Sequence, residues 1–307
     1  KNFMKELKPH SMEDIIAGIS LYRPGPMDFI PQYIRGKNRP DTIHYDCPQL
    51  EPILKATHGC IVYQEQVMQI VQSLAGFTLG RSDLLRRAMS KKKLNVMEKE
   101  RQAFVYGNEA EGVPGCIKNG IDEKIANKIY DEMIDFAQYA FNKSHAAAYA
   151  YVTYQTAFLK YYYPVEYMAA LMTSVIDKPT KVAEYIQVCR QMNIPILPPD
   201  INKGEYGFSV SGGSILYALS AIKSVGRPVI EAIVAERKEH GEYLSVKNFI
   251  ERNMEAVNKR AIENFIKAGA LDCLEGNRHQ KMVVFGQIVD DISRNKKQSM
   301  AGQLSLF

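Results

Sequence analysis

Apolar residues recur every three or four positions along much of this 307-residue chain, which is the spacing that buries one side of an α-helix. The spacing predicts helices over residues 13–21, 63–74, 83–92, 123–139, 144–163 and 165–174. Ser82 and Ser144 are suited to cap two of these helices, and Pro164 ends one and opens the next. Before residue 60, frequent prolines predict short helices joined by fixed turns.

The pattern changes after Asn193. Residues 196–200 are expected to be extended, and residues 208–210 and 215–217 flank a Ser-Gly-Gly-Ser turn, which predicts a small β-hairpin. Helical spacing resumes near Ala218 and continues to Ser293, and it is compatible with two related helical pairs. The sequence therefore predicts a mainly α fold, with a domain boundary between residues 175 and 215.

Composition sets the broad class of protein. Hydrophobic residues make up 46% of the chain, which is enough for a substantial core and for two domains. The net charge of +5 is too small to establish a nucleic-acid partner, so that inference depends on local clusters. The five cysteines are widely spaced without a C-x-x-C pair, which disfavours a zinc site or disulfide framework and favours a reducing cytoplasm.

The chain shows no recognisable signal peptide. The apolar stretch 146–172 is interrupted by Gln155, Lys160 and Glu166, so we expect a buried or interfacial helix and no membrane partner. The chain opens at Lys1 without an initiator methionine, which indicates a segment of a longer protein.

Residues 81–93 carry six basic side chains against one acid, Asp83. Like charges on one side of a helix repel each other unless an anion lies between them. Arg86 and Arg87 therefore suit a phosphate chain, to which guanidinium groups make bidentate contacts. The alternative is a solvated basic face, which is common for a run of charge.

A second cluster, Lys143-Ser144-His145, lies at a predicted helix start, where backbone N–H groups favour anions. The alternative is an ordinary helix cap followed by a surface histidine. Gln64 lies in a string, residues 63–68, whose glutamines are able to hydrogen-bond a base or a sugar, but the string could equally be a plain helix start.

No metal site is predicted within the chain. The sequence contains no Asp-x-Asp, and the pairs Asp131/Asp135 and Asp290/Asp291 are expected to be solvated. Two-metal phosphoryl transfer needs convergent carboxylates on a rigid frame. The chain also lacks a Ser-His-Asp arrangement and the Walker and Rossmann patterns.

Seven strings occur in the order and at the spacing of one known family. They are Tyr22–Pro26, Tyr63–Met68, Leu85–Met89 with Lys91–Lys93, Phe141–His145, Tyr154–Thr156, Tyr163–Pro164 and Leu197–Asn202. On these strings, essentially the whole chain resembles the bacterial DNA polymerase III alpha subunit, the C-family of replicative polymerases.

The resemblance implies helical polymerase fingers over residues 1–175, a tandem helix-hairpin-helix region over 176–295 and a flexible tail over 296–307. It implies that Arg86 and Arg87 contact the triphosphate of the incoming dNTP, and that His145 lies near the sugar and disfavours ribonucleotides. The residues expected to line the same pocket are Lys143, Ser144 and Gln64. Ala146 departs from the serine of many relatives, which puts a hydroxyl contact there in doubt.

The resemblance also implies partners and a cofactor. The partners would be dNTP, primer–template DNA, the β sliding clamp and other replisome subunits. The catalytic aspartates of the family lie in the palm, which precedes this segment and would hold Mg²⁺. The segment alone is therefore expected to be inactive. The lysines expected to contact DNA in the fingers are Lys91, Lys92 and Lys93.

Residues 219–235 predict a helix, a short turn and a helix. Such a hairpin presents backbone N–H groups to a DNA phosphate without reading sequence. The candidate DNA contacts are Lys223, Ser224, Gly226 and Arg227. The family pattern is Gly-x-Gly, and Ser224 replaces the first glycine, which weakens this interpretation because a non-glycine residue resists positive φ. The alternative is a purely structural helical pair; a second pair follows over residues 258–272.

The chain ends in a short apolar string after the polar stretch 296–302. The string resembles the sliding-clamp binding motif, and its residues are Gln303, Leu304, Ser305, Leu306 and Phe307. The alternative is a strand cut from a missing domain. Two other classes stay open: a non-catalytic DNA-binding module using residues 215–272, and a clamp-binding adaptor using only the tail.

Overall fold

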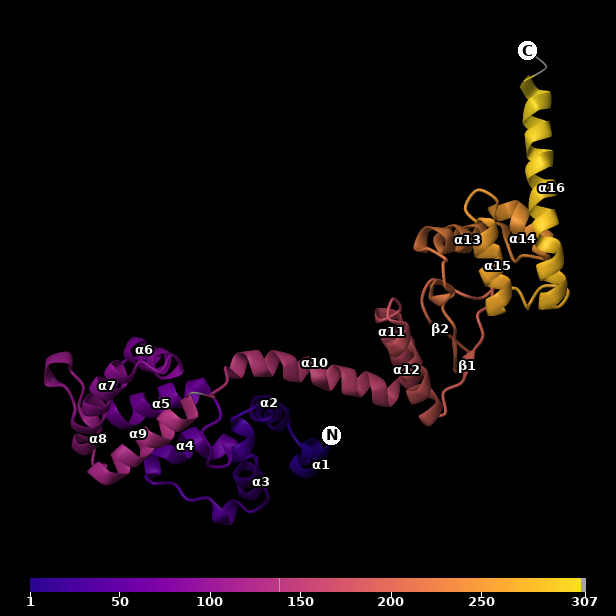
Figure 1. Cartoon of the computed structure of the whole chain (residues 1–307). Helices are drawn as coiled ribbons and strands as arrows, with labels where there is room; N and C mark the ends of the chain where they lie inside the picture. The colour runs from indigo at the N-terminus through magenta and orange to yellow at the C-terminus, as the bar shows by residue number, and fades with distance from the viewer. Residues whose placement is uncertain (138, 305–307) are drawn as a thin grey trace. The chain divides into compact units, whose positions relative to one another are not determined.

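The computed structural model describes residues 1–137 and 139–304 (Figure 1). The chain forms two compact units, residues 1–155 and 156–307. The residues of helix α10 (Lys143–Tyr162) are divided between these two units.

The first unit is built from helices joined by tight turns. Of the five short 3-10 turns among the residues described in this unit, three begin at a proline, whose fixed φ and missing N–H suit a first helical position. Besides the start of α10, the helices are α1 (Asn2–Leu7), α2 (Met12–Leu21), α3 (Ile30–Asn38), α4 (Glu51–Leu54), α5 (Gln64–Ala75), α6 (Leu79–Ser90), α7 (Leu94–Tyr106), α8 (Gly115–Lys118) and α9 (Glu123–Ala137).

Two predicted helix caps are wrong. Helix α6 begins before Ser82 and is capped by Thr78, whose Oγ1 accepts the N–H of Arg81 at 3.3 Å. Ser82 is buried inside the helix and donates to the carbonyl of Thr78 at 2.8 Å. Helix α10 begins at Lys143, and its cap is Asn142 rather than Ser144. In both cases the residue directly before the helix makes the cap, and a nearby serine of the right type does not.

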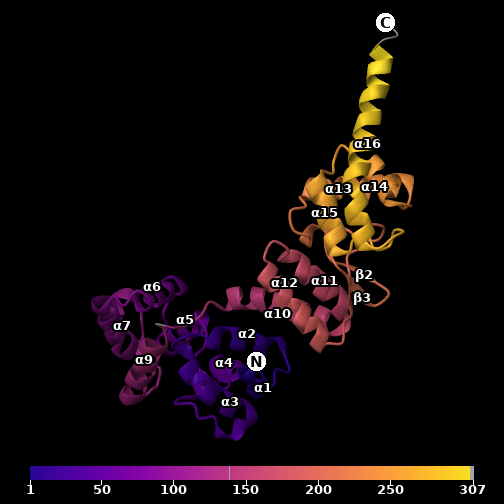
Figure 2. The same ribbon diagram turned by 45° about the vertical axis from the view of Figure 1, so that its right-hand side comes forward.

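The core of the first unit has two parts. Helices α5, α6, α7 and α9 lie side by side (Figure 2) and bury a cluster that includes Ile70, Leu85, Phe104 and Tyr130. Helices α1, α2, α3 and the start of α10 bury a second cluster that includes Tyr33 and Ala146. Both clusters border the N-terminal end of α5, where Gln64 lies.

The second unit continues with helices and a small sheet. Strands β1 (Ile196–Leu197), β2 (Ser209–Ser211) and β3 (Ser214–Leu216) have the order β1-β3-β2. The predicted hairpin β2–β3 is confirmed, and β1 adds to it in parallel. The remaining helices are α11 (Pro164–Ser174), α12 (Pro179–Gln191), α13 (Arg227–His240), α14 (Val246–Asn253), α15 (Lys259–Ala268) and α16 (Arg278–Leu304).

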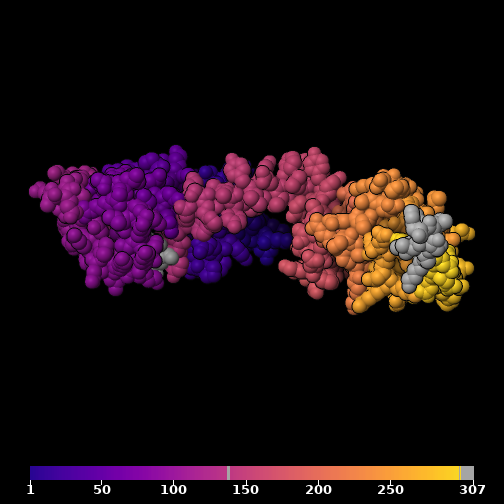
Figure 3. All heavy atoms as spheres, turned by 90° about the horizontal axis from the view of Figure 1, so that it is seen from above, coloured from indigo at the N-terminus to yellow at the C-terminus, as the bar shows by residue number. Residues whose placement is uncertain are grey.

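Helices α13 to α16 share one hydrophobic cluster, and their atoms form one packed body in the space-filling view (Figure 3). The predicted mainly helical fold is confirmed, with two corrections. The helix expected from Leu219 is only a 3-10 turn, Leu219–Ala221. Helix α16 does not end near Ser293 but runs to Leu304, so the stretch expected to be flexible, residues 296–302, is helical.

The longer α16 has a simple cause, because Lys, Gln, Met and Ala are all good helix formers. The last residues of the predicted clamp motif, Ser305, Leu306 and Phe307, lie outside the described residues. Among residues 1–137 and 139–304, none of the helices combines the length and the apolar character needed to cross a bilayer.

Candidate functional site

Asp83 lies between the two arginines of α6. Its Oδ1 accepts hydrogen bonds from Nη2 and Nε of Arg86 at 2.6 and 3.0 Å, and its Oδ2 lies 2.7 Å from Nε of Arg87. The hydrogen bonds from Arg86, followed by the charges of both arginines, hold the pKa of Asp83 below its ordinary value. An ionised carboxylate therefore balances two cations that would otherwise repel each other.

The two arginines differ in what else they touch. The Arg86 side chain is 21% exposed, and its Nη1 donates to Oε1 of Gln64 at 2.8 Å. The Arg87 side chain is 63% exposed, and within residues 1–137 and 139–304 its Nη1–Nη2 edge has no partner. Arg87 thus presents the planar edge with which guanidinium groups bind phosphate oxygens.

Gln64 joins α6 to the segment that precedes α10. Its Nε2 donates to the carbonyl of Ala140 at 3.1 Å, and its backbone N–H donates to the carbonyl of Phe141 at 3.0 Å. Tyr63 and Phe141 also form a parallel β-bridge. The start of α5 therefore fixes residues 140–141 next to the helix that carries Arg86.

The start of α10 is capped by two side chains. Oδ1 of Asn142 accepts the N–H of His145 at 2.9 Å and the hydroxyl of Ser144 at 2.6 Å. Both Glu65 oxygens lie 3.1 Å from the N–H of Lys143. A carboxylate of the chain itself thus occupies the electropositive end of this helix.

Lys143 and His145 lie among aromatic rings. The Lys143 ammonium is 3.0 Å from Oε2 of Glu13 and 5.2 Å from the centre of the Tyr63 ring. The exposed His145 ring packs between those of Phe141 and Tyr149, at 5.5 and 4.9 Å. The packing orients the imidazole without using a hydrogen bond from either neighbour.

The sequence does not predict the roles of the three acids of this site, Asp83, Glu65 and Glu13. A signal is present for Asp83, the one acid of the basic run 81–93, and for Glu65, which lies inside the string 63–68. Of the six basic residues in 81–93, Arg81 is not available to a ligand. It is paired with Glu100 at 2.7 Å and with Glu111.

Lys91, Lys92 and Lys93 follow the last turn of α6 and are exposed. The N–H groups of Lys92 and Lys93 bond back to the carbonyls of Met89 and Ala88, at 3.0 and 2.9 Å. Lys92 has a φ of 53°, so the chain reverses sharply here. The three ammonium groups have no acidic partner among the described residues, so they remain candidates for phosphate contacts.

The predicted hairpin turn in the second unit lies between the 3-10 turn and α13. Ser224 adopts a φ of 62°, so it takes the left-handed conformation despite not being glycine. Val225 is buried, whereas Lys223, Ser224, Gly226 and Arg227 are exposed. The side chain of Arg227 lies 2.7 Å from Glu231 of its own helix.

A second hairpin, residues 254–258, joins α14 to α15 and repeats the first one. Val257 is buried as Val225 is. Asn258 caps α15 with φ and ψ of −90° and 165°, close to the −82° and 159° of Gly226 before α13. The two hairpins therefore share an apolar anchor and the backbone conformation of the residue before the helix, but Ser224 has a φ of 62° and none of residues 254–258 has a positive φ.

The second hairpin differs from the first in its charges, which are paired with α16. Glu255 and Lys259 lie 2.6 Å from Lys296 and Asp290. The hydrogen bond from Lys296 lowers the pKa of Glu255. In the first hairpin, by contrast, Lys223 has no ion-pair partner within the described ranges. Lys223 of the first hairpin is therefore a cation that is open to a ligand.

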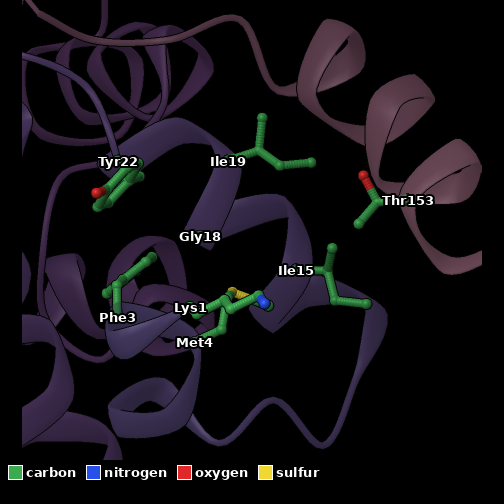
Figure 4. Close-up of a pocket in the computed structure, with 8 residues that line it drawn as sticks. All are labelled: Lys1, Phe3, Met4, Ile15, Gly18, Ile19, Tyr22 and Thr153. Carbon is green, nitrogen blue, oxygen red and sulfur yellow. The ribbon is translucent and has the colours of Figure 1, made fainter. Parts of the chain in front are cut away.

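An apolar cavity of about 280 Å³ lies between α1, α2 and the first-unit part of α10 (Figure 4). Ile15 and Ile19 of α2 lie on one side of it and Thr153 of α10 on the other. No predicted site residue is among those that line it. Within residues 1–137 and 139–304, no group of three metal-ligating side chains gathers, and the expected surface acids Asp131 and Asp290 are ion-paired.

Comparison with known proteins gives matches over the whole chain. Residues 1–112 match a model described as the bacterial DNA polymerase III alpha subunit finger domain, and residues 193–281 match a helix-hairpin-helix motif. A relative named DNA polymerase III subunit alpha, from Chlamydia trachomatis serovar D, is 46% identical over 100% of this chain and 24% of its own length. The protein of the same name from Thermus aquaticus is 45% identical over 99% of this chain and 25% of its own length. The one from Borreliella burgdorferi is 41% identical over 100% of this chain and 26% of its own length. The chain spans about a quarter of the length of these relatives.

Proposed function

Because the chain belongs to the family of bacterial DNA polymerase III alpha subunits, we propose that it grips the incoming dNTP and holds primer–template DNA in a DNA-directed DNA polymerase of the cytoplasm. Residues 1–175 act as the fingers, residues 176–295 as the tandem helix-hairpin-helix region, and residues 296–307 as the carrier of a clamp-binding motif. The other replisome subunits complete the set of partners.

One observation supports the proposed nucleotide site. Gln64 connects Arg86 to residues 140–141, so the arginine pair and the start of α10 belong to one hydrogen-bonded assembly. In the proposed complex, the free edge of Arg87 meets the triphosphate, and Lys143 and Ser144 lie beside it. His145 lies at the sugar, where a 2′-hydroxyl would meet its ring.

The charges of this site explain how a triphosphate is accommodated. Asp83 balances the two arginines of α6, Glu13 pairs with the Lys143 ammonium, and Glu65 accepts the backbone N–H of Lys143. A triphosphate offers more negative oxygens than a single carboxylate, and guanidinium groups make charge-assisted bonds to phosphate as they do to carboxylate. The site is therefore built to exchange internal carboxylates for phosphate oxygens rather than to expose bare cations.

The Mg²⁺ ions of the reaction lie elsewhere in this proposal. The described residues include no cluster of carboxylates that fits a pair of metal ions. The palm, outside this chain, holds the ions and the reacting groups, so residues 1–307 alone do not polymerise. The residues of this chain bind and orient the nucleotide.

The nucleotide site is tested in the full-length polymerase by replacing Arg87 with alanine. Loss of a charge-assisted contact is expected to raise the KM for dNTP about tenfold or more, because such bonds contribute about 1.5–3 kcal/mol. Arg35→Ala serves as the control, since that arginine is exposed on α3. An unchanged KM in Arg87→Ala would contradict the proposed site.

The clamp contact is tested at the other end of the chain. Leu306→Ala combined with Phe307→Ala removes the apolar residues that an extended clamp-binding peptide inserts into a pocket. Binding of the full-length protein to the β sliding clamp, measured by surface plasmon resonance, is expected to vanish. Persistent binding would refute a role for this motif.

A further inference from the structure

We infer that Gln64 is a positioning residue that sets the separation between the phosphate end and the sugar end of the nucleotide site. This inference rests on the proposed function but assigns Gln64 a different task. From the resemblance, Gln64 is expected among the groups that touch the nucleotide. The structure instead directs both ends of its amide toward other parts of the protein.

The amide of Gln64 works as a two-ended link. Its Oε1 accepts from the Arg86 guanidinium at 2.8 Å, and its Nε2 donates to the carbonyl of Ala140 at 3.1 Å. A link of this kind needs an acceptor for a cation and a donor for a carbonyl on one side chain. Among neutral side chains of this length, only a carboxamide offers both in a fixed plane.

The two ends of the link lead to the two halves of the site. Arg86 is held by Asp83 on its other edge, next to Arg87, which presents its free edge to phosphate. Ala140 lies directly before the segment that carries Lys143, Ser144 and His145. The backbone of Gln64 is itself fixed by its bond to Phe141. A change at one half is therefore transmitted to the other through one amide.

Loss of the link is expected to leave the fold intact. The segment before α10 is also held by Glu65, which accepts from Asn142 at 3.1 Å, and by the bridge between Tyr63 and Phe141. Displacements well under the size of a residue are enough to weaken catalysis when binding groups must meet a ligand together. The expected effect is therefore on nucleotide binding and selection rather than on the amount of folded protein.

The test replaces Gln64 with methionine, which keeps the length of the side chain and removes both hydrogen bonds, in the full-length polymerase. The KM for dNTP is expected to rise about three- to tenfold, and the preference for dNTP over the ribonucleotide to fall by a similar factor. Gln64→Asn, whose amide is one methylene shorter, provides a second variant that keeps the polarity. Gln69→Met, at an exposed position of the same helix, is the control.

Double variants separate positioning from direct contact. If Gln64 acts through Arg86, Gln64→Met raises KM no further once Arg86 is alanine. If it acts through the start of α10, it lowers sugar selection no further in a His145→Ala background. Equal effects of Gln64→Met in the variant and wild-type backgrounds would show a direct contact and overturn the inference, as would no effect in the wild type.

The failure of this inference is distinct from failure of the proposed function. If Arg87→Ala leaves the KM for dNTP unchanged, the nucleotide site itself is misplaced. If Arg87→Ala raises KM while Gln64→Met matches the Gln69→Met control, only the link is refuted. Thermal unfolding of each variant shows whether a lower rate comes from a loss of folded protein, which would leave KM and sugar selection unchanged.

Discussion

The repeated hairpins of the second unit give a prediction with its own internal control. Lys223 of the first hairpin is exposed and has no ion-pair partner among the described residues, whereas Lys259 lies 2.6 Å from Asp290 of α16. If the first hairpin holds a DNA phosphate, Lys223→Ala removes one phosphate contact. Lys259→Ala removes a cation that is already neutralised within the protein.

The size of the effect follows from counterion release. Each phosphate that a protein neutralises contributes about 0.9 to the slope of log affinity against log salt concentration on duplex DNA. Lys223→Ala is therefore expected to reduce this slope by about 0.9. When the salt concentration rises fourfold, the affinity of the wild type should therefore fall by a factor about 3.5 times larger than that of Lys223→Ala.

The assay is the binding of the full-length protein to a labelled primer–template duplex, followed by fluorescence anisotropy over a series of potassium chloride concentrations. Lys223→Ala should weaken binding equally on duplexes of different sequence, because backbone contacts carry no sequence information. Lys259→Ala should leave the slope unchanged. The reasoning is refuted if both variants change the slope by the same amount, or if only Lys259→Ala does so.

Three further predictions concern the first unit. Asp83→Asn removes the carboxylate that competes with phosphate for Arg86 and Arg87. The KM for dNTP should therefore fall at low salt and approach the wild-type value at high salt. A KM that rises at low salt would contradict this prediction. His145→Ala should increase ribonucleotide incorporation by the full-length enzyme, measured by alkaline cleavage of the product, and no increase would exclude a sugar contact. Burial raises the pKa of the Cys60 thiol from 9.0 to about 12. The unfolded chain therefore releases this proton at a lower pH, and the free energy of unfolding should fall as pH rises from 9 toward 12. Cys60→Ala should make this fall less steep, and an equally steep fall in the variant would disprove the prediction.

Much of the fold follows from periodicity, because long amphipathic helices such as α5 and α9 bury one continuous stripe. Boundaries follow less well, since several nearby residues have the chemistry of a cap. Thr78 and Ser82 are both suitable by type, and only the path of the chain before α6 decides that Thr78 serves. The prediction for the end of α16 is wrong for a related reason, because a polar stretch suggests a flexible tail although its residues favour helix.

The candidate site was predictable as a set of cations but not as an arrangement. A basic run on one helix identifies Arg86 and Arg87, and the string 141–145 identifies Lys143 and His145. Their partners come from distant positions, as in the contact between Gln64 and Ala140. Sequence spacing does not reveal such contacts, so a residue that links two halves of a site looks like one that binds a ligand.

The duplicated hairpin has a consequence for how natural variation in this region should be interpreted. Glu255 of the second hairpin and Lys259, the first residue of α15, make ion pairs with α16, so substitutions there change the cohesion of the second unit. Substitutions at Lys223 disturb no such pair. Variants in the two copies of the motif should therefore differ in a screen. Those in the second hairpin should change resistance to heat or protease, and those in the first should change how long the enzyme stays on its template.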